Sequence, residues 1–272
     1  RQMCIRDRVC AMGETADMSG ECASRTNLEM PDVQQELLAE LAKTGKPVVL
    51  LNFAGRPTVL SWEEEHIPAI MNVWFGGSEV GDALCDVIFG DKVPSGKLTT
   101  SMPKTTGQEP LYYNHQNTGR PVPDDNQKFA KFASNCLDVS NGPLYPFGYG
   151  LSYTTFEYGD LKLSSHEVNM DDWKITATIN IKNTGIRDAD EVVQLYIRDM
   201  VASISRPVKE LKGFQRIHLA AGESREISFD ITPEMLKFYN AELKHVIEPG
   251  DFQIMVGGNS KEVKTQNLTV KN

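Results

Sequence analysis

The sequence lacks the patterns that mark several classes of protein. Its five cysteines form no Cys-x-x-Cys pair and are irregularly spaced, so neither a zinc site nor a disulfide framework is indicated. Its five histidines are scattered, without a His-x-x-x-His pair or a carboxylate at helical spacing, and we expect no metal. No apolar run approaches the roughly 18 residues that a membrane-spanning helix needs. With a net charge of -9, the chain lacks the basic balance of a nucleic-acid-binding protein. We therefore expect neither a nucleic-acid nor a membrane partner.

Two glycine-rich stretches fall short of the nucleotide-binding loops that they suggest. Residues 76–81 do not have the G-x-G-x-x-G spacing. Residues 90–97 place five residues between the two glycines where the P-loop has four, and Leu98 stands where that motif requires Ser or Thr. The sequence therefore predicts no bound nucleotide, and we expect no cofactor of any kind.

The first half of the chain alternates strand-like and helix-like stretches. Short apolar runs over 9–12, 48–53 and 70–75 predict strands, and 48–53 is apolar enough to be covered on both faces. The spacing predicts a helix over 31–43, with Val33, Leu37 and Leu41 on one face, and a second helix ending near Phe89. This alternation predicts a mainly parallel sheet with helices on its faces.

The last part of the chain changes its hydrophobic period. Residues 175–181 alternate strictly between apolar and polar side chains, which indicates a half-buried strand. Further strands are predicted over 192–198, 211–218, 224–231, 236–239, 250–256 and 267–270. Short strands at this rhythm predict an all-β sandwich of immunoglobulin or fibronectin type III kind.

A connector rich in glycine, proline and aromatic residues separates these two parts. Residues 142–153 read Gly-Pro-Leu-Tyr-Pro-Phe-Gly-Tyr-Gly-Leu-Ser-Tyr, which cannot form a regular helix and is too aromatic for a solvated linker. This stretch closely resembles the connector of glycoside hydrolase family 3, where it joins an α/β sandwich domain to a fibronectin type III-like domain. In that resemblance, residues 74–77 and 94–98 are structural signatures of the α/β sandwich. The fold class implied is α/β followed by all-β.

The resemblance and the composition together divide the chain into four segments. Residues 9–141 are assigned to the α/β sandwich domain, 142–158 to the connector and 159–272 to the fibronectin type III-like domain. Residues 1–8 have no apolar core like that of a secretory signal and look like translated sequencing adapter. We therefore expect the natural sequence to enter near Val9, with a longer N-terminal region missing.

A loop with three carboxylates follows the first predicted strand. Most glycosidases need two carboxylates, one an acid and the other a nucleophile or base. Glu14, Asp17 and Glu21 lie at a strand end, where α/β sheets usually carry ligand sites. In the family, a Glu in a Ser-Gly-Glu context followed shortly by Arg is the acid/base, and Glu21 matches it. The resemblance thus implies a catalytic role for Glu21, a structural role for Glu14 and a solvated Asp17.

The second carboxylate of the pair is not found in the chain. The family's nucleophile is an Asp in a Ser-Asp-Trp-like context on an N-terminal (β/α)8 barrel, which the resemblance does not cover. The only Asp-Trp pair here is Asp172-Trp173, preceded by Asp171 in a polar turn that we expect to be a hairpin tip.

A long polar loop over 105–138 offers candidate sugar contacts. Residues 112–121 mix aromatic faces with hydrogen-bonding side chains, and we single out Tyr113, His115 and Arg120 as substrate-binding residues. The alternative interpretation, loop packing against the α/β domain, is the more frequent use of such segments.

The sequence is thus interpreted as the C-terminal part of a retaining β-glucosidase acting on a glucoside or oligosaccharide, inactive by itself. A non-catalytic carbohydrate-binding or adhesion module is an alternative of another class, and a β-xylosidase or other exo-glycosidase is a third. The resemblance also implies a periplasmic or secreted protein, and a dimer is possible in solution.

Overall fold

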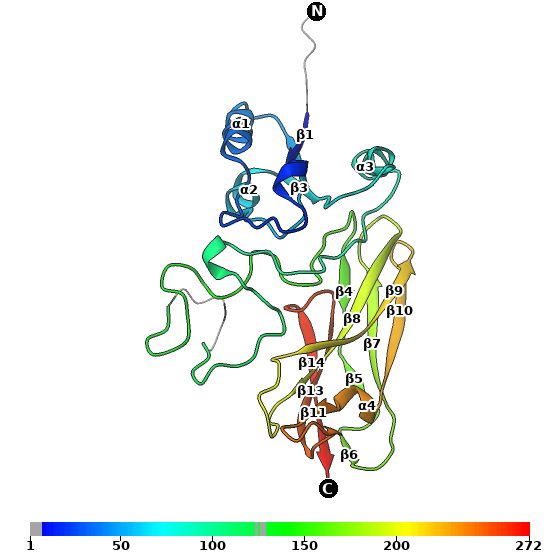
Figure 1. Ribbon diagram of the computed structural model, residues 1–272. Helices are drawn as coiled ribbons and strands as arrows, with labels where there is room; N and C mark the ends of the chain where they lie inside the picture. Colours follow the sequence, from blue (N-terminus) through cyan, green and yellow to red (C-terminus); the bar gives the residue numbers. More distant parts are fainter. Residues whose placement is uncertain (1–6, 123–124, 126–128) are drawn as a thin grey trace, which may run out of the picture.

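An α/β domain lies at one end of the molecule and a β-sandwich at the other, with the N-terminus and the C-terminus at opposite ends (Figure 1). The computed structural model describes residues 7–122, 125 and 129–272. Most of the segment that the sequence assigned to adapter therefore lies outside the described residues. Within those residues, no helix has both the length and the apolar character that crossing a bilayer requires.

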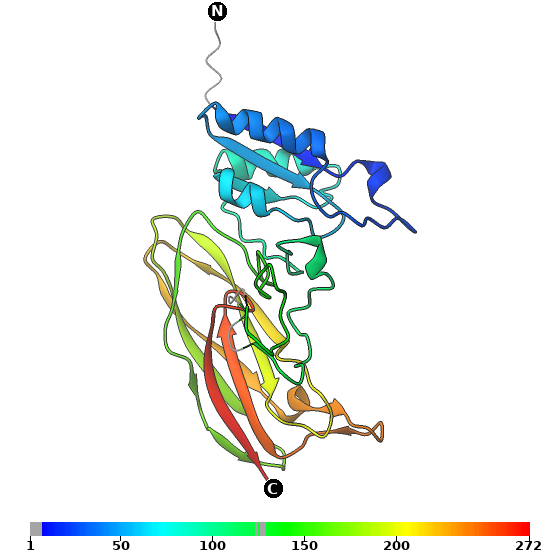
Figure 2. The ribbon, with the colours of Figure 1, turned by 90° about the vertical axis from the view of Figure 1, so that its left-hand side faces the viewer.

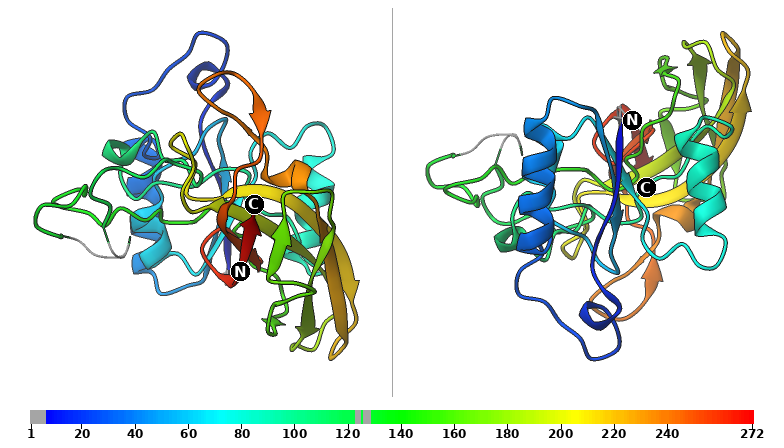
Figure 3. Two further views of the ribbon diagram at one scale, coloured as in Figure 1. Left: turned by 90° about the horizontal axis from the view of Figure 1, so that it is seen from below. Right: turned by 90° about the horizontal axis from the view of Figure 1, so that it is seen from above.

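The α/β domain is built on a parallel sheet of three strands. Its strands, in the order β1-β2-β3, are β1 (Arg8–Gly13), β2 (Val48–Phe53) and β3 (Ala69–Asn72). Its helices are α1 (Asp32–Lys43), α2 (Ser61–His66), α3 (Val80–Ile88) and the 3-10 turn η1 (Ala16–Met18). Helices α1 and α2 lie on one face of the sheet and α3 on the other (Figures 1 and 3). The predicted parallel sheet with helices on its faces is confirmed.

The buried face of α1 differs from the one that the sequence pattern grouped. Of the predicted residues, Leu41 packs against the core, but Val33 is 77% exposed and Leu37 51% exposed, whereas Leu38 is fully buried. Gln34, one turn before Leu38, exchanges two hydrogen bonds with the backbone of Gly13, at 2.7 and 3.0 Å. The side of α1 that faces the sheet therefore includes Gln34 and Leu38. Gln34 belongs to it although it is polar, because it binds the backbone at the end of β1.

The β-sandwich has two sheets. The four-stranded sheet has the order β10-β7-β4, with β5 also paired to β7, and the five-stranded sheet has the order β6-β14-β13-β8-β9. The longer strands are β7 (Ile175–Asn183), β8 (Ala189–Asp199), β9 (Glu210–Leu219), β10 (Ser224–Ile231), β13 (Gly250–Gly257) and β14 (Val263–Lys271). The shorter elements are β4 (Phe156–Tyr158), β5 (Lys162–Leu163), β6 (Glu167–Asn169), α4 (Pro233–Leu236), β11 (Phe238–Tyr239) and β12 (His245–Val246).

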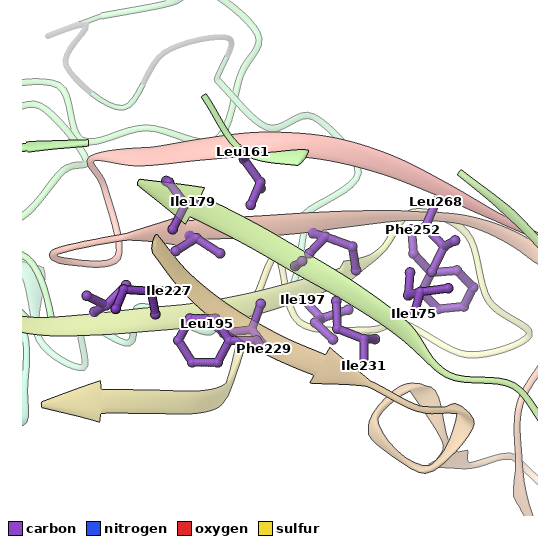
Figure 4. Close-up of a cluster of buried hydrophobic side chains, with 14 of the residues drawn as sticks. Leu161, Ile175, Ile179, Leu195, Ile197, Ile227, Phe229, Ile231, Phe252 and Leu268 are labelled. Atoms are coloured by element: carbon purple, nitrogen blue, oxygen red, sulfur yellow. The ribbon is translucent and has the colours of Figure 1, made fainter. Parts of the chain in front are cut away.

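The core of the sandwich fills the space between the two sheets (Figure 4). Strand β7 buries every second residue, as its alternating sequence predicts, and Ile179 and Ile181 are almost wholly buried. They face Leu195 of β8 and Ile254 of β13 in the same cluster. This core is made by residues of the last part of the chain alone, so the predicted sandwich is confirmed.

Three local expectations differ from the structure. The strand predicted over 236–239 is shorter in the structure, because Leu236 ends the short helix α4, whose first turn begins at Pro233, and β11 starts only at Phe238. Residues 170–174 join β6 to β7, which belong to different sheets, so the Asp172-Trp173 turn is not a hairpin tip. Strand β4 pairs with β7, so the four-stranded sheet extends into the segment assigned to the connector.

A buried ion pair joins the α/β part to the sandwich. The Nζ of Lys97 lies 3.1 Å from Oε2 of Glu191 on β8 and donates to the carbonyl of Gly150 at 3.1 Å. The hydroxyl of Tyr158 donates to the same Glu191 carboxylate at 2.7 Å. Burial and the nearby Glu191 carboxylate raise the pKa of Tyr158 well above its ordinary value. Lys97, the lysine of the stretch that resembles a P-loop, is therefore paired with a carboxylate of the same protein.

A buried amide supports the same junction. The Nε2 of Gln194 donates to the carbonyls of Gly148 and Gly258 at 3.2 and 2.6 Å. Gly148 has a φ of +80°, and a Cβ added there would lie 2.1 Å from Oε1 of Gln194. Only glycine therefore lets the connector approach β8 this closely.

We predict that Glu191→Gln lowers the free energy of unfolding by about 3–5 kcal/mol, because the Lys97 ammonium would stay buried without its counter-ion. The Glu40–Lys43 pair is a matched control, since its side chains are 69% and 70% exposed. Glu40→Gln should change stability by less than about 1 kcal/mol. Urea denaturation followed by circular dichroism measures both, and equal small losses would contradict the prediction.

We also predict that residues 154–272, expressed alone, fold as a β-sandwich, because both sheets and the core lie within them. Residues 7–141 should be the less stable part, since Val33 and Leu37 of α1 and Phe89 after α3 are exposed to water. Circular dichroism and thermal unfolding of the separate fragments test this. A higher midpoint for residues 7–141 would overturn it.

Candidate active site

The carboxyl ends of the three parallel strands meet at one edge of the α/β sheet. Gly13 ends β1 with a φ of +131°, and a Cβ there would lie 1.9 Å from the carbonyl oxygen of Phe53. The next residue, Glu14, donates its N–H to the same carbonyl at 2.7 Å. The chain beyond β2 supplies Gly55 and Arg56 to this edge. In open α/β sheets ligand sites form at such edges, where loops from neighbouring strands converge.

Glu14 is the centre of a buried ion cluster at this edge. Its side chain is 1% exposed, and its Oε1 lies 3.1 Å from Nη1 of Arg25 and 2.9 Å from Nε of Arg56. Its Oε2 accepts the N–H of Gly55 at 3.0 Å. Arg56 also donates to the carbonyl of Met18 at 2.7 Å. The Glu14 carboxylate thus connects the end of β1 with Arg25 of the following loop and with the residues that follow β2.

The charge state of Glu14 follows from these partners. Burial by itself would raise the pKa of its carboxyl. The N–H of Gly55 and the two guanidinium groups outweigh burial and hold the pKa below its ordinary value. Glu14 therefore stays ionised near neutral pH and cannot donate a proton in catalysis.

Glu21 lies on the loop that this cluster closes. The loop, dark blue in Figure 2, protrudes from one side of the α/β domain between β1 and α1. The Glu21 side chain is exposed, and the structure gives it no hydrogen-bond partner among the described residues. Cys22, next to it, has a φ of +61°, which makes the turn that presents Glu21. Asp17, as expected, is also exposed.

Phe75 stands beside the same loop. It follows β3, is 61% exposed, and lies close to Gly55, whose added Cβ would be 2.8 Å from Cε2 of Phe75. The same Cβ would lie 2.1 Å from Oγ of Ser19. Gly55 thus lets the Ser19 segment and the Phe75 ring approach the end of β2 together.

A second buried carboxyl in this domain has the opposite surroundings. Glu63 of α2 is 1% exposed, and its Oε1 accepts a long bond from Gln35 at 3.4 Å, while its Oε2 has no partner. Burial is the main cause that raises the pKa of Glu63, and the Glu29 carboxylate adds to it. Without the two arginines that hold Glu14, Glu63 is a buried group of α2 rather than a member of the Glu14 cluster.

The Asp-Trp pair, which the sequence did not assign to the site, lies far from this edge. Asp171 and Asp172 lie between β6 and β7, at the end of the molecule opposite the α/β domain (Figure 1). They cannot form a catalytic pair with Glu21 within one chain. No cluster of three or more His, Cys, Asp or Glu side chains suited to a metal ion occurs among the described residues.

The loop over 105–138 contacts the sandwich and encloses a separate cavity. Tyr113 stacks on Phe147 at 4.2 Å, and its hydroxyl accepts the N–H of Leu211 at 3.2 Å. The cavity of about 700 Å³ is lined by Tyr113 and His115 from the loop, and by Arg198 and Lys209 from the sandwich. Neither Arg120 nor Glu21 lines it. The predicted site residues are thus not brought into one pocket.

The sequence did not identify Arg56 as part of the site. Arg56 lies 42 positions after Glu14, and no motif links the two, although both follow neighbouring strands. The carboxyl ends of adjacent parallel strands always meet at one edge, and this rule could have paired the two residues. Arg25 is the arginine of the Ser-Gly-Glu…Arg motif, but the motif does not indicate that Arg25 pairs with Glu14.

The chain matches two known domain families. Residues 7–153 match the Glycosyl hydrolase family 3 C-terminal domain, and residues 191–260 match the Fibronectin type III-like domain. The first match alone covers more than half of the chain.

Similar proteins come from several bacteria. A periplasmic β-glucosidase of Salmonella typhimurium is 48% identical over 94% of this chain and 33% of its own length. A β-xylosidase of Formosa agariphila is 42% identical over 97% of this chain and 35% of its own length. A crystal structure of a Listeria innocua β-glucosidase with gluconolactone superposes with a TM-score of 0.92 and 41% identity, over 98% of this chain and 37% of that one. The chain thus spans about a third of the length of the curated relatives it matches.

We predict opposite pH dependences for the two buried carboxyls. Since the pKa of Glu14 is lowered, its contribution to stability is present above its ordinary value of 4.5 and is lost as pH falls through the folded value. Glu14→Gln should therefore cost about 3 kcal/mol at pH 7, with the difference from the parent shrinking in acid. Since the pKa of Glu63 is raised, its contribution is present below 4.5 and is lost as pH rises. Glu63→Gln should therefore be near neutral at pH 4 and stabilising at pH 7.

Thermal unfolding of both variants and the parent between pH 3.5 and 7.5 measures these differences. The parent serves as the reference at each pH. Parallel curves for Glu14→Gln and Glu63→Gln would contradict the assignment of opposite charge environments.

Proposed function

We propose, since this chain belongs to glycosyl hydrolase family 3, that it is part of a retaining β-glucosidase in which Glu21 is the general acid/base. The observation that carries the proposal is the exposed Glu21 on a loop closed by the Glu14 cluster, at the carboxyl edge of a parallel sheet. Its sequence context, residues 19–25, is the one in which the family carries this carboxyl. The nucleophile would be an aspartate of a (β/α)8 barrel outside this chain.

The two carboxyls would then act on opposite sides of the reacting carbon. The barrel aspartate attacks the anomeric carbon, while Glu21 gives its proton to the departing glycosidic oxygen. Water then hydrolyses the glycosyl-enzyme, with Glu21 taking the proton back. A carboxyl that donates a proton near neutral pH has to be removed from water. Because Glu21 is exposed in this chain, the barrel and the bound glycoside would have to cover it.

The substrate contacts on the 105–138 loop are a further part of the proposal. Tyr113 and His115 line a cavity that mixes aromatic and hydrogen-bonding groups, a mixture suited to the C–H faces and hydroxyls of a sugar. The ring and hydroxyl of Tyr113 are already engaged by the sandwich, so Tyr113 shapes the wall of the cavity. The exposed side chain of His115, whose Nδ1 lies 3.2 Å from the carbonyl oxygen of Gln116, and the exposed Arg120 outside the cavity would contact a glucoside or oligosaccharide.

A β-xylosidase is the second candidate, because a relative 42% identical to this chain is named as one. A β-glucoside carries one hydroxymethyl group that a β-xyloside lacks, and no contact among the described residues distinguishes the two substrates. The periplasmic relative leads us to propose a periplasmic or secreted location.

The acid/base role predicts a dependence on the leaving group. The test enzyme is a chimera in which this chain replaces the matching segment of the Salmonella typhimurium β-glucosidase. Glu21→Gln should lower kcat/KM for cellobiose by about 10²–10⁴-fold, because its leaving group needs protonation. Dinitrophenolate leaves without a proton, so dinitrophenyl glucoside should glycosylate the Glu21→Gln enzyme at nearly the parent rate. Added azide should then restore turnover, and the product should be the β-glycosyl azide.

The 272-residue chain alone is the baseline, and we expect it to give no turnover because the nucleophile is outside it. Asp17→Asn, on the same loop, is the matched control and should behave as the parent. An equal loss on all substrates without azide rescue would assign Glu21 a structural role instead.

A further inference from the structure

We infer that Glu14, Arg25 and Arg56 are positioning residues for the acid/base, and that they act by fixing the loop that carries Glu21. The inference rests on the proposed role of Glu21. It assigns to the three residues a function in the rate of proton transfer, in addition to their part in stability.

The loop has no apolar anchor of its own. Between Glu14 and Met30 no residue is buried, and residues 15–25 contain only two local backbone bonds, Met18 N–H to Thr15 and Ala23 N–H to Gly20. Bonds between the loop backbone and the backbone of the rest of the domain begin only at Leu28. A segment with few buried contacts samples many conformations unless other interactions restrain it. General acid catalysis requires the carboxyl to stay within hydrogen-bond reach of the departing oxygen.

The ion cluster supplies the restraint at three points. The contact between Glu14 and Arg25 closes the loop, with Glu21 inside the closed segment. Arg56 donates a hydrogen bond to the loop backbone at Met18, and the N–H of Gly55 donates to the Glu14 carboxylate. Arg25 in turn donates to the carbonyl of Glu29 at 3.2 Å, where the loop returns to the domain.

The geometry of the cluster is specific to arginine. Arg56 donates from Nη2 to the carbonyl of Met18, while its Nε lies 2.9 Å from Oε1 of Glu14 as an ion-pair contact without a hydrogen bond, so one rigid guanidinium spans the carboxylate and the loop backbone. A lysine at this position would keep the positive charge but could not hold both partners in a fixed geometry. Charge and positioning can therefore be separated by substitution.

The experiment uses the chimera described above and a series of glucosides with leaving groups of increasing basicity. The variants are Glu14→Gln and Arg56→Lys, with Glu21→Gln as the reference and Glu63→Gln as the control for loss of a buried carboxyl elsewhere in the domain. Misplacement by about 1 Å can cost about 10²-fold in rate. We expect Glu14→Gln to lower kcat/KM for cellobiose by about 10–10²-fold and that for dinitrophenyl glucoside by less than about 3-fold.

Two further readouts separate positioning from mere stability. Amide hydrogen exchange of residues 15–24 should quicken in both variants, while the exchange of β2 stays unchanged. Glu63→Gln should keep the parent's leaving-group dependence. If Glu14→Gln does not fold, Arg56→Lys carries the test, because it keeps the positive charge beside Glu14 and removes the guanidinium that donates to the carbonyl of Met18.

The outcomes distinguish this inference from the proposed function. A leaving-group-dependent loss in Glu14→Gln or Arg56→Lys, with faster loop exchange, supports positioning. A uniform loss, or no loss, in these variants while Glu21→Gln keeps its acid/base signature overturns the positioning role alone. If Glu21→Gln itself shows no leaving-group dependence, the proposed function fails and this inference fails with it.

Discussion

The buried ion pair between Lys97 and Glu191 is the constraint on which the joint between the two domains depends. Two charges taken from water are tolerated only when their remaining hydrogen-bonding capacity is filled, and here Gly150 and Tyr158 fill it. These four groups come from three stretches of the chain, since Lys97 precedes the connector, Gly150 and Tyr158 both lie within it, and Glu191 is on β8. The connector must therefore follow a single path between the domains, and the close approach of Gly148 to Gln194 is part of that path.

The same physical device recurs at the candidate site, with a different consequence. Glu14 is buried and paired with cations, as Glu191 is, but its partners lie on a loop and on the end of a neighbouring strand. The first cluster holds two domains together, whereas the second restrains one exposed loop. Glu63 has no arginine beside it, and burial raises its pKa, whereas the Gly55 N–H and two guanidinium groups lower the pKa of Glu14. The donors and charges beside each buried carboxyl, and not burial alone, therefore set the direction in which its pKa moves.

Much of the fold could be predicted because its signals are local. The strand predictions over 48–53 and 224–231 agree with β2 and β10 to the residue, since 48–53 is a nearly continuous apolar run and 226–231 alternates between polar and apolar residues. The predictions that differ depend on distant partners. The buried face of α1 follows from Gln34 binding Gly13, and the turn at Asp172 connects two sheets rather than two neighbouring strands.

The sequence by itself determined the order of the elements, the two-domain division and the loop context of Glu21, because periodicity, glycine, proline and short motifs act over a few neighbouring residues. Only the tertiary structure decided that Glu14 pairs with Arg25 and Arg56, that Lys97 is used by Glu191, and that the Tyr113 loop faces a cavity apart from Glu21. These contacts join residues separated by tens of positions. They depend on which strand ends meet at a sheet edge and on which charged groups are buried together. No local sequence pattern indicates either of these arrangements.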